Sequence, residues 1–537
     1  MAQAGTLSSR RTLALAATWP AWALGAGALL LIAAFDLGPP LAFNDDWGMA
    51  WSVRHLNLLH PHVYPGDSAL ALPQIIWGWL LSLGGGDQRL LRLSELVFVG
   101  MTMYAGHRLA RLLGAGPAES VLAALAPLAL PVFTADATTF MTDVPYVGLL
   151  MLSALGAARW LHDGDRRGLA LCGLFAVLAT LQRQIGVLIP LALTLTLLLE
   201  RRRPEGRDWT WLALLWAGCL AAVVLPAVTG LAPPTQSNRL EAALTPRPGV
   251  IVGALNHLPA MLGLGLLIFL PGLLATARSR LLRPATLLLA TLLLAVVFAA
   301  PQPNPSIFPG NVFAAASLNW TILPGDKPPM FPGPLYLALE LAALFTALVL
   351  LVRTPLRGWL SPRTGPAGFL ALLAVTQLLP LVLLSYVAFD RYYLPVIAPL
   401  VPLAAWSVSG APRAARSYAL GLGIVVLGLA LYAAGEQDYQ AWQVARDQAA
   451  RLAYETYSPY DVKAGYEAQA VYGEVPYYDR TGRPLSALAQ PGAHDFSIDG
   501  PEHPLAELEF ARPDDPRPGF GYWSLAPGKV VIQPLQP

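Results

Sequence analysis

The sequence has little charge. Only 13% of its 537 residues are Asp, Glu, Lys or Arg, whereas a soluble domain carries about 25%. Hydrophobic residues make up 55% of the chain, and the mean hydropathy is +0.51. The 49 prolines and 47 glycines follow no collagen period, so disorder does not account for the missing charge. This composition excludes an ordinary soluble protein and predicts an all-α membrane protein with many spans.

Cysteine, lysine and several catalytic motifs are also scarce or absent. The two cysteines, Cys172 and Cys219, lie inside apolar runs, which predicts buried thiols and no disulfide framework. Only three lysines are present, so nearly all positive charge is arginine. The chain contains no Walker loop and no GxSxG element, and therefore offers no motif for nucleotide chemistry in the cytoplasm.

The charge is divided unevenly along the chain. Residues 1–435 hold 27 basic and 18 acidic residues, a net charge of +9, whereas residues 436–537 hold 8 and 15, a net charge of −7. We therefore expect a membrane domain over 1–435 and a small polar α+β domain over 436–537. The basic residues lie in short loops rather than in one patch, so we expect no nucleic acid partner.

Thirteen apolar segments are candidates for membrane spans, since a span needs about 20 mostly apolar residues. The first follows Arg10 and Arg11, and we expect it to be a retained span rather than a cleaved signal peptide. The candidate spans are 12–35, 89–107, 118–134, 144–161, 169–182, 184–200, 209–230, 253–276, 284–300, 334–352, 366–388, 393–409 and 417–435.

The arginines between these spans predict the orientation of the chain. Of the 27 basic residues in 1–435, 19 lie at the N-terminus or in every second junction, and 8 lie on the other side. Because cytoplasmic loops carry an excess of Lys and Arg, we expect a cytoplasmic N-terminus and an extracytoplasmic domain 436–537 in a bacterial plasma membrane.

The outer loops hold the unusual features. In the first loop, Trp47–Leu59 and Leu70–Leu83 are predicted to form helices in the membrane interface, with their tryptophans at headgroup depth. The loop Pro301–Gly333 is rich in proline and is a candidate cover for a substrate. The polar domain begins with a predicted helix, Tyr439–Tyr454.

Two acidic clusters lie in the outer loops. Asn44, Asp45 and Asp46 follow the first span, and paired carboxylates beside an apolar wall are suited to general base chemistry. The alternative is that one of them caps the next helix. Asp136 and Asp143 lie between the third and fourth spans, where Asp143 is equally suited to cap a helix with Pro145 in its first turn.

Two basic clusters lie on the same side. Arg183, between Gln182 and Gln184, is suited to hold a phosphate, or else to reach the phosphates of the lipid. Arg391 follows Asp390, with which it could form a local ion pair of small value. Carboxylates and arginines together at the outer interface indicate a reaction on a lipid-linked phosphate.

We expect no cofactor. A divalent metal is the alternative, because three histidines share the first outer loop with the acidic pair, although no HExxH spacing is present. The candidate ligands are His55, His60, His62, Asp45 and Asp46.

Four motifs in this order resemble the GT-C glycosyltransferases, in particular the bacterial branch grouped with protein O-mannosyltransferases and lipid A aminoarabinose transferases. They are Asp45-Asp46 before the interfacial helices, Thr142 to Pro145, Arg183 before Gly186 and Pro190, and Arg391-Tyr392-Tyr393-Leu394-Pro395. Gly465-Tyr466-Glu467 is similar to the small outer domain of the bacterial members. The family more often has Asp-Glu at the first motif, and the lysine-bearing first-loop stretch of the aminoarabinose branch is absent.

The resemblance implies an inverting transfer of a sugar from a polyprenyl phosphate to a hydroxyl of a lipid, glycan or protein. It implies that Asp45 is the general base, that Asp46 tunes it or binds sugar, and that Asp143 assists on the acceptor side. It implies that Arg183, Arg391 and Tyr392 bind the donor phosphate, with weaker substrate contacts from Gln184, Asp136 and His62.

Other functions stay open at this point. A lipid-linked glycan polymerase or ligase would share the architecture, and a transporter or flippase would place charges such as Glu95 and Glu340 inside the membrane. A non-catalytic protein would use the outer carboxylates only as helix caps.

Overall fold

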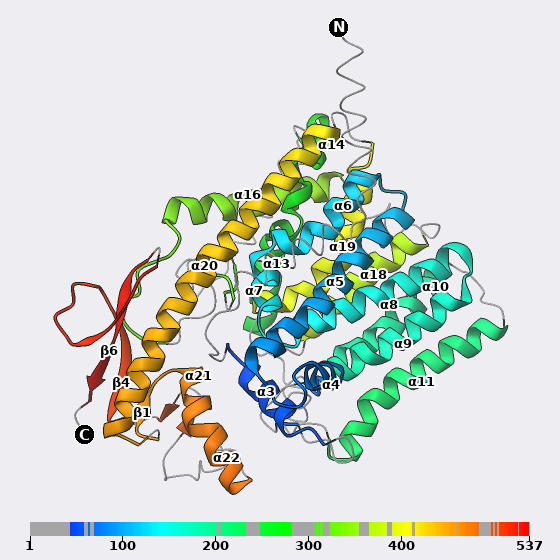
Figure 1. The fold of residues 1–537 in the computed structure, drawn as a ribbon. Helices are drawn as coiled ribbons and strands as arrows, with labels where there is room; N and C mark the ends of the chain where they lie inside the picture. Colours follow the sequence, from blue (N-terminus) through cyan, green and yellow to red (C-terminus); the bar gives the residue numbers. More distant parts are fainter. Residues whose placement is uncertain are drawn as a thin grey trace.

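The computed structural model shows a helical body with a small sheet at one side (Figure 1). The expected spans 12–35 and 284–300 lie outside the described residues. The structure describes residues 43–57, 63–64, 69–200, 206–231, 248–281, 306, 308–310, 312–314, 323–353, 365–383, 389–410, 414–458, 460–482, 496–497, 500–501, 504–524 and 526–535.

Two short helices occupy the first outer loop, as the sequence predicts. They are α3 (Asp46–Arg54) and α4 (Leu72–Leu81). The body then consists of α5 (Gln88–Leu112), α6 (Pro117–Leu125), η1 (Ala126–Ala129), α7 (Pro131–Ala137), α8 (Asp143–Asp163), α9 (Arg166–Gln182), η2 (Gln184–Val187), α10 (Leu188–Leu199), α11 (Gly206–Val228), α13 (Pro248–Gly265), η3 (Leu267–Phe269), α14 (Leu270–Leu281), α16 (Gly333–Arg353), α18 (Pro366–Leu383), η4 (Asp390–Tyr393), α19 (Leu394–Ser407) and α20 (Ala414–Thr456).

The chain is an integral membrane protein. Within the described ranges, six helices are long and apolar enough to cross a membrane, and one bent pair would make a seventh. Only 22% of the apolar stretch of α11 is buried, so leucines and valines of this helix face outward, as expected for contact with lipid. Helices also occupy other expected spans, and some of them are short, α10 having 12 residues. The count of thirteen stays a prediction.

Small residues let the central helices approach closely. A Cβ atom on Gly148 of α8 would lie 2.8 Å from the carbonyl oxygen of Phe98 on α5. One on Gly156 would lie 2.6 Å from the backbone nitrogen of Cys172 on α9. Helices in membranes associate by such close packing rather than by a hydrophobic force between them. Cys172 and Cys219 are both buried free thiols, as predicted.

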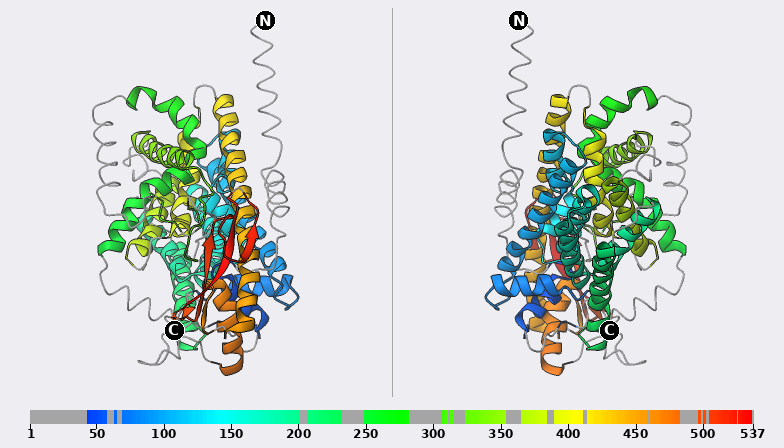
Figure 2. Two further views of the ribbon diagram at one scale, coloured as in Figure 1. Left: turned by 90° about the vertical axis from the view of Figure 1, so that its left-hand side faces the viewer. Right: turned by 90° about the vertical axis from the view of Figure 1, so that its right-hand side faces the viewer.

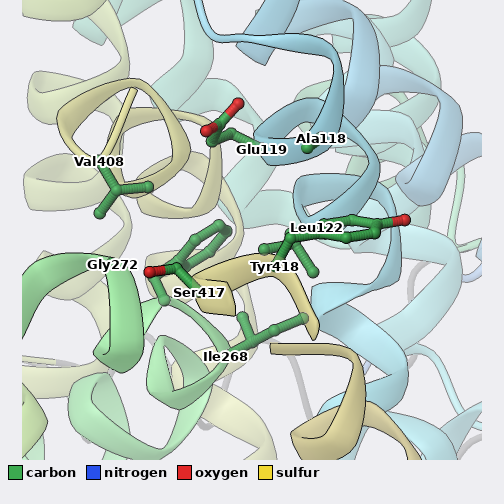
Figure 3. Close-up of a pocket in the computed structure, with 9 residues that line it drawn as sticks. Ala118, Glu119, Leu122, Ile268, Gly272, Val408, Ser417 and Tyr418 are labelled. Carbon is green, nitrogen blue, oxygen red and sulfur yellow. The ribbon is translucent and has the colours of Figure 1, made fainter. Parts of the chain in front are cut away.

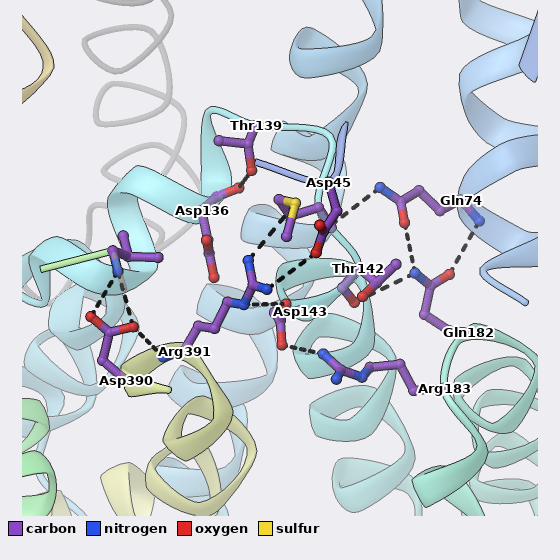
Figure 4. A network of polar contacts seen from close by, with 12 residues as sticks. Asp45, Gln74, Asp136, Thr139, Thr142, Asp143, Gln182, Arg183, Asp390 and Arg391 are labelled. Carbon is purple, nitrogen blue, oxygen red and sulfur yellow. Dashed lines mark hydrogen bonds and ion pairs between the residues drawn. The ribbon is translucent and has the colours of Figure 1, made fainter. Parts of the chain in front are cut away.

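The predicted span 118–134 is not one straight helix. It is broken into α6 with η1 and then α7, and the two parts are bent by 70°. Leu130 has an extended backbone because the following residue, Pro131, disfavours the helical conformation there. The bend places α7 beside η4, and Figure 4 shows Asp136 among the polar residues described below.

The C-terminal domain is α+β, as predicted. Its core joins α20 to one face of the sheet, where Trp442 packs edge-on against Phe510 at 5.2 Å between ring centroids. The sheet has the order β1-β4-β6-β5, with β1 parallel to β4 and the other pairs antiparallel. Besides the end of α20, the elements of the domain are β1 (Val462–Lys463), α21 (Tyr466–Gln469), η5 (Ala470–Glu474), α22 (Val475–Thr481), β2 (Phe496–Ser497), β3 (Gly500–Pro501), β4 (Ala506–Ala511), β5 (Gly519–Tyr522) and β6 (Gly528–Pro534).

One helix connects the two parts of the chain. The expected boundary between residues 435 and 436 falls inside α20, which runs for 43 residues without a break. Figure 2 shows the sheet beside the lower half of this helix, while its upper half packs with the body. The expected separate helix Tyr439–Tyr454 is therefore the continuation of the last span.

The tryptophans of α3 are buried in protein, whereas the sequence predicts them at headgroup depth. Trp47 and Trp51 are 5% and 3% exposed. Both rings pack edge-on against Tyr64, and the Trp51 indole donates a hydrogen bond of 2.7 Å to Asp479 of α22. The C-terminal domain therefore covers this helix.

Described residues from loops that are expected on the same side contact one another. The Gly116 backbone N–H donates to the Ser409 hydroxyl at 3.2 Å, which joins two loops expected on the cytoplasmic side. Arg166 and Asp208 form an ion pair of 3.2 Å between two other loops expected there. Asp45 and Arg391, from two loops expected outside, contact each other at the opposite end, where α3, α21 and α22 lie (Figure 1).

Candidate active site

A tight turn sets the orientation of the acidic pair. The Phe43 backbone N–H donates to the Asp46 carboxylate at 2.7 Å, and the Asp46 N–H donates to the Phe43 carbonyl at 3.0 Å. Between them Asn44 has a φ of 50°, a left-handed conformation that is unfavourable for most residues but more accessible to asparagine. The turn points the two adjacent carboxylates in different directions.

The two members of the pair have different environments. The Asp46 side chain is fully buried, with an oxygen 3.7 Å from the Arg92 guanidinium. Burial raises the pKa of Asp46 to about 7, and the charge of Arg92 opposes this only in part. The Asp45 side chain is 42% exposed. Only Asp45 is therefore accessible to a substrate in this structure.

The side chain of Asp45 does not cap α3. The residue occupies the N-cap position of α3 but makes no capping hydrogen bond through its side chain. Its oxygens contact two groups from distant parts of the chain instead. One lies 3.3 Å from the Arg391 guanidinium, and the other accepts a hydrogen bond of 2.6 Å from the Tyr466 hydroxyl.

A buried carboxylate connects the two predicted arginines (Figure 4). Asp143 begins α8, is 2% exposed and pairs with Arg183, which follows α9. Its other oxygen lies 3.8 Å from Nε of Arg391. Successive contacts from Asp45 to Arg391, Asp143 and Arg183 bring together four residues from distant parts of the sequence. Arg183 is 15% exposed, so its pairing is mainly with protein rather than with lipid.

Asp390 does not hold Arg391 by a local ion pair as expected. Its carboxylate accepts hydrogen bonds from the backbone N–H groups of Val312, Phe313 and Arg391 at 2.6 to 3.2 Å. Burial raises the pKa of Asp390 to about 6, and these hydrogen bonds limit the rise. Asp390 thereby ties η4 to the described part of the loop 301–333, and the Arg391 side chain is left to reach Asp45 and Asp143.

Tyr392 contacts both arginines. The centre of its ring lies 5.5 Å from the Arg183 guanidinium and 5.7 Å from that of Arg391. These distances are within the range in which a ring face attracts a cation. The side chain therefore helps to keep two like charges near each other.

The weaker predicted contacts have different outcomes. Asp136 is 1% exposed, and Figure 4 shows its carboxylate near the Arg391 guanidinium. Gln184 begins η2 and is half-buried. His62 and His60 lie outside the described residues. In the described part of the chain, no three His, Cys, Asp or Glu side chains are grouped so that they would hold a metal ion.

The structure adds two groups to the site that sequence reasoning missed. Gln182 and Gln74 exchange hydrogen bonds of 2.7 and 3.3 Å, and Gln74 also donates to Glu95 at 2.9 Å and to the Met141 carbonyl at 3.2 Å. These buried hydrogen bonds fix the segment before Asp143, through the Met141 carbonyl. The signal in the sequence is the polar triplet Gln182-Arg183-Gln184, of which Gln182 contacts Gln74.

The second addition comes from the C-terminal domain. Tyr466 reaches Asp45, as described above, and the next residue, Glu467, accepts a hydrogen bond of 3.2 Å from the Asn44 backbone N–H. Glu467 also pairs with Arg446 of α20 at 2.6 Å. The similarity of Gly465-Tyr466-Glu467 to a family motif is the signal in the sequence.

A hollow in the protein lies away from these residues. It is formed between α6, η3, α14 and α20 (Figure 3), and none of the predicted site residues lines it. Its lining is mostly apolar, with Glu119, Ser417 and Tyr418 as the polar members. The candidate active site is thus a polar network at the opposite end of the body rather than this hollow.

Comparisons with known proteins agree with the resemblance. Residues 67–227 match the family model "Dolichyl-phosphate-mannose-protein mannosyltransferase". No curated protein matches the chain. Among solved structures, ArnT from Cupriavidus metallidurans bound to undecaprenyl phosphate has 16% identity, with 94% of this chain and 96% of that chain covered and a TM-score of 0.43. Its apo form has the same identity and coverage, and a TM-score of 0.41.

Two of the four motifs, Thr142 to Pro145 and Arg183 with Gly186 and Pro190, lie inside the matched segment. The other two motifs, Asp45-Asp46 and the one that begins at Arg391, lie outside it, but Asp46 lies beside Arg92 and Arg391 beside Asp143 of the matched segment. The match over residues 67–227 confirms that this chain resembles the membrane glycosyltransferases of the mannosyltransferase family.

Proposed function

We propose that the protein is an inverting glycosyltransferase that moves a sugar from a polyprenyl phosphate to an acceptor hydroxyl at the outer face of the membrane. The observation that carries this proposal is the contact of Asp45, the accessible carboxylate, with an arginine pair held by Asp143. The family match supports the donor class, since the family description names a sugar on a polyprenyl phosphate.

Asp45 is the proposed general base. It is 42% exposed, whereas Asp46 is fully buried and paired with Arg92, so only Asp45 is placed to meet an acceptor. In the proposed step the acceptor O–H gives its proton to Asp45, and the acceptor oxygen forms a bond to C1 of the sugar. The bond from C1 to the phosphate oxygen breaks, and its electron pair leaves with the phosphate.

Arg183 and Arg391 are the proposed partners of the leaving phosphate. With Asp45 and Asp143 ionised, the two arginines are balanced by two negative charges. When Asp45 takes the proton, one negative charge is lost from this group, and the phosphate gains one at the same moment. The arginines then stabilise the charge where it develops in the transition state. Asp143 serves to hold both guanidinium groups in place.

The proposed orientation has the candidate active site outside the cytoplasm. Arginine-rich junctions meet at one end of the body, as the contacts Gly116–Ser409 and Arg166–Asp208 indicate. The carboxylate and arginine network lies at the other end together with the C-terminal domain. By the positive-inside rule the first end is cytoplasmic, which supports an extracytoplasmic site and C-terminal domain.

The test is transfer by the purified full-length protein in lipid vesicles, using a panel of polyprenyl-phosphate sugars labelled in the sugar. We expect Asp45→Asn to lower kcat by about 100-fold or more, because a general base contributes about 10²- to 10⁴-fold. Asp479→Asn is the matched control, since Asp479 is also a partly exposed acid beside α3 but contacts Trp51 rather than the arginines.

Full activity of Asp45→Asn would refute the assignment of the base. A different outcome is that the wild-type protein cleaves none of the donors and transports a lipid-linked sugar across the vesicle membrane. That result would refute the transferase and favour a flippase. Attachment of the label to a lipid, a glycan or a peptide in the same assay identifies the acceptor class.

A further inference from the structure

Two separate parts of the chain hold the Asp45 carboxylate from its two oxygens. Arg391, in η4 of the membrane body, lies 3.3 Å from Oδ2. Tyr466, in α21 of the C-terminal domain, donates its hydroxyl hydrogen to Oδ1 at 2.6 Å. A carboxylate held at both oxygens keeps one orientation, whereas a partly exposed carboxylate held at one oxygen rotates between several.

The C-terminal domain also supports the turn that carries Asp45. Glu467 accepts a hydrogen bond from the Asn44 backbone N–H at 3.2 Å, and Arg446 of α20 holds Glu467 at 2.6 Å. Asn44 has a φ of 50°, and such a conformation persists when surrounding contacts over-determine it. The backbone and the side chain of this turn are thus both held by adjacent residues of α21.

A glycine makes this double contact possible. Gly465 precedes Tyr466 with a φ of 84° and a ψ of 160°, a combination that only glycine adopts readily. The chain therefore turns sharply between the short strand β1 and α21. This turn directs Tyr466 and Glu467 together toward the Phe43–Asp46 turn.

We propose that Tyr466 is a positioning residue for the base and that the C-terminal domain completes the active site. This inference rests on the proposed function. Tyr466 acts through Asp45: its hydroxyl keeps the carboxylate turned toward the position of the acceptor hydroxyl. The domain therefore contributes to the chemical step itself rather than only to the binding of a distant part of a substrate.

The test is Tyr466→Phe in the full-length protein, which removes one oxygen atom and keeps the ring. We expect kcat to fall by about 10- to 100-fold, the size of effect that a hydrogen bond to a charged group has. The KM for the polyprenyl-phosphate sugar should change by less than about twofold, because the Tyr466 hydroxyl donates its hydrogen bond to the base, Asp45. Tyr472→Phe is the matched control, since Tyr472 donates to Asp447 at 2.5 Å in the same domain.

The outcomes separate this inference from the proposed function. Wild-type kcat in Tyr466→Phe, with Asp45→Asn inactive, overturns the positioning role and leaves the transferase intact. Equal losses of kcat in Tyr466→Phe and Tyr472→Phe also overturn it, because the effect would then come from a general change in the domain. A loss of kcat confined to Tyr466→Phe, with unchanged thermal unfolding, supports it. Full activity of Asp45→Asn refutes the proposed base itself.

Discussion

Asp143→Asn should destabilise the protein much more than Asp45→Asn, although both substitutions remove a carboxylate that contacts Arg391. Asp143 is 2% exposed and lies between Arg183 and Arg391, which are 15% and 5% exposed. Replacement by asparagine keeps the size of the side chain and removes its charge. Two mostly buried guanidinium groups then lose a shared partner.

The magnitude follows from burial. Removal of one member of a buried ion pair costs about 3–5 kcal/mol, because the other charge remains buried without compensation. Arg391 keeps its contact with Asp45, and Arg183 retains some exposure to water. We therefore expect the lower end, about 3 kcal/mol. Asp45 is 42% exposed, and exposed pairs contribute only about 0.2–1 kcal/mol.

The assay is unfolding of the purified variants in one detergent, followed by heating and by denaturant, with transfer activity measured in parallel. We expect Asp143→Asn to lose both stability and activity, and Asp45→Asn to lose activity alone. Adding Arg183→Gln to Asp143→Asn should restore part of the stability, because the double variant removes an unpaired charge. If Asp143→Asn unfolds like the wild-type protein, Asp143 is not the group that balances the arginines.

Two further predictions concern pH and metal ions. Burial raises the pKa of Asp46 from 3.8 to about 7, so the stability that its neutral form contributes is fully present below about pH 4 and is lost as the pH rises through 7. Asp46→Asn should therefore flatten the loss of stability between pH 5 and pH 8, measured by thermal unfolding; an unchanged slope would contradict the assigned burial of this charge. EDTA should leave transfer activity unchanged, because two arginines already supply positive charge beside Asp45; loss of activity that Mg²⁺ or Mn²⁺ restores would show that a metal is required.

The membrane class and the order of the helices follow from local patterns in the chain. A low fraction of charged residues and runs of about 20 apolar residues predict membrane spans without knowledge of how the helices pack. The reason is that each helix in lipid makes its backbone hydrogen bonds within itself. The alternation of arginines predicts which loops meet at each end, and the contacts Arg166–Asp208 and Asp45–Arg391 agree with it. The acidic composition of residues 436–537 likewise predicts a separate polar domain.

Side-chain direction is less predictable than position. Asp45 and Asp46 are neighbours of the same type, and only the left-handed turn at Asn44 places one toward solvent and the other in the core. Gln182 contacts Gln74 from the end of α9, and the extended backbone of the next residue, Arg183, separates α9 from η2. A shift of one residue or one dihedral angle reverses such an assignment.

Contacts between distant segments could be identified only in the folded chain. Tyr466 and Asp45 are 421 residues apart, and no periodicity in either segment relates them. The burial of Trp47 and Trp51 has the same origin, since the C-terminal domain covers a helix whose composition is equally suited to a lipid surface. Composition and periodicity depend on residues near in sequence and thus determine the class, the spans and the candidate residues. The tertiary structure alone decides that Asp45 is exposed to solvent and that Arg391 and Tyr466 hold it, because these contacts form only when the helices pack together.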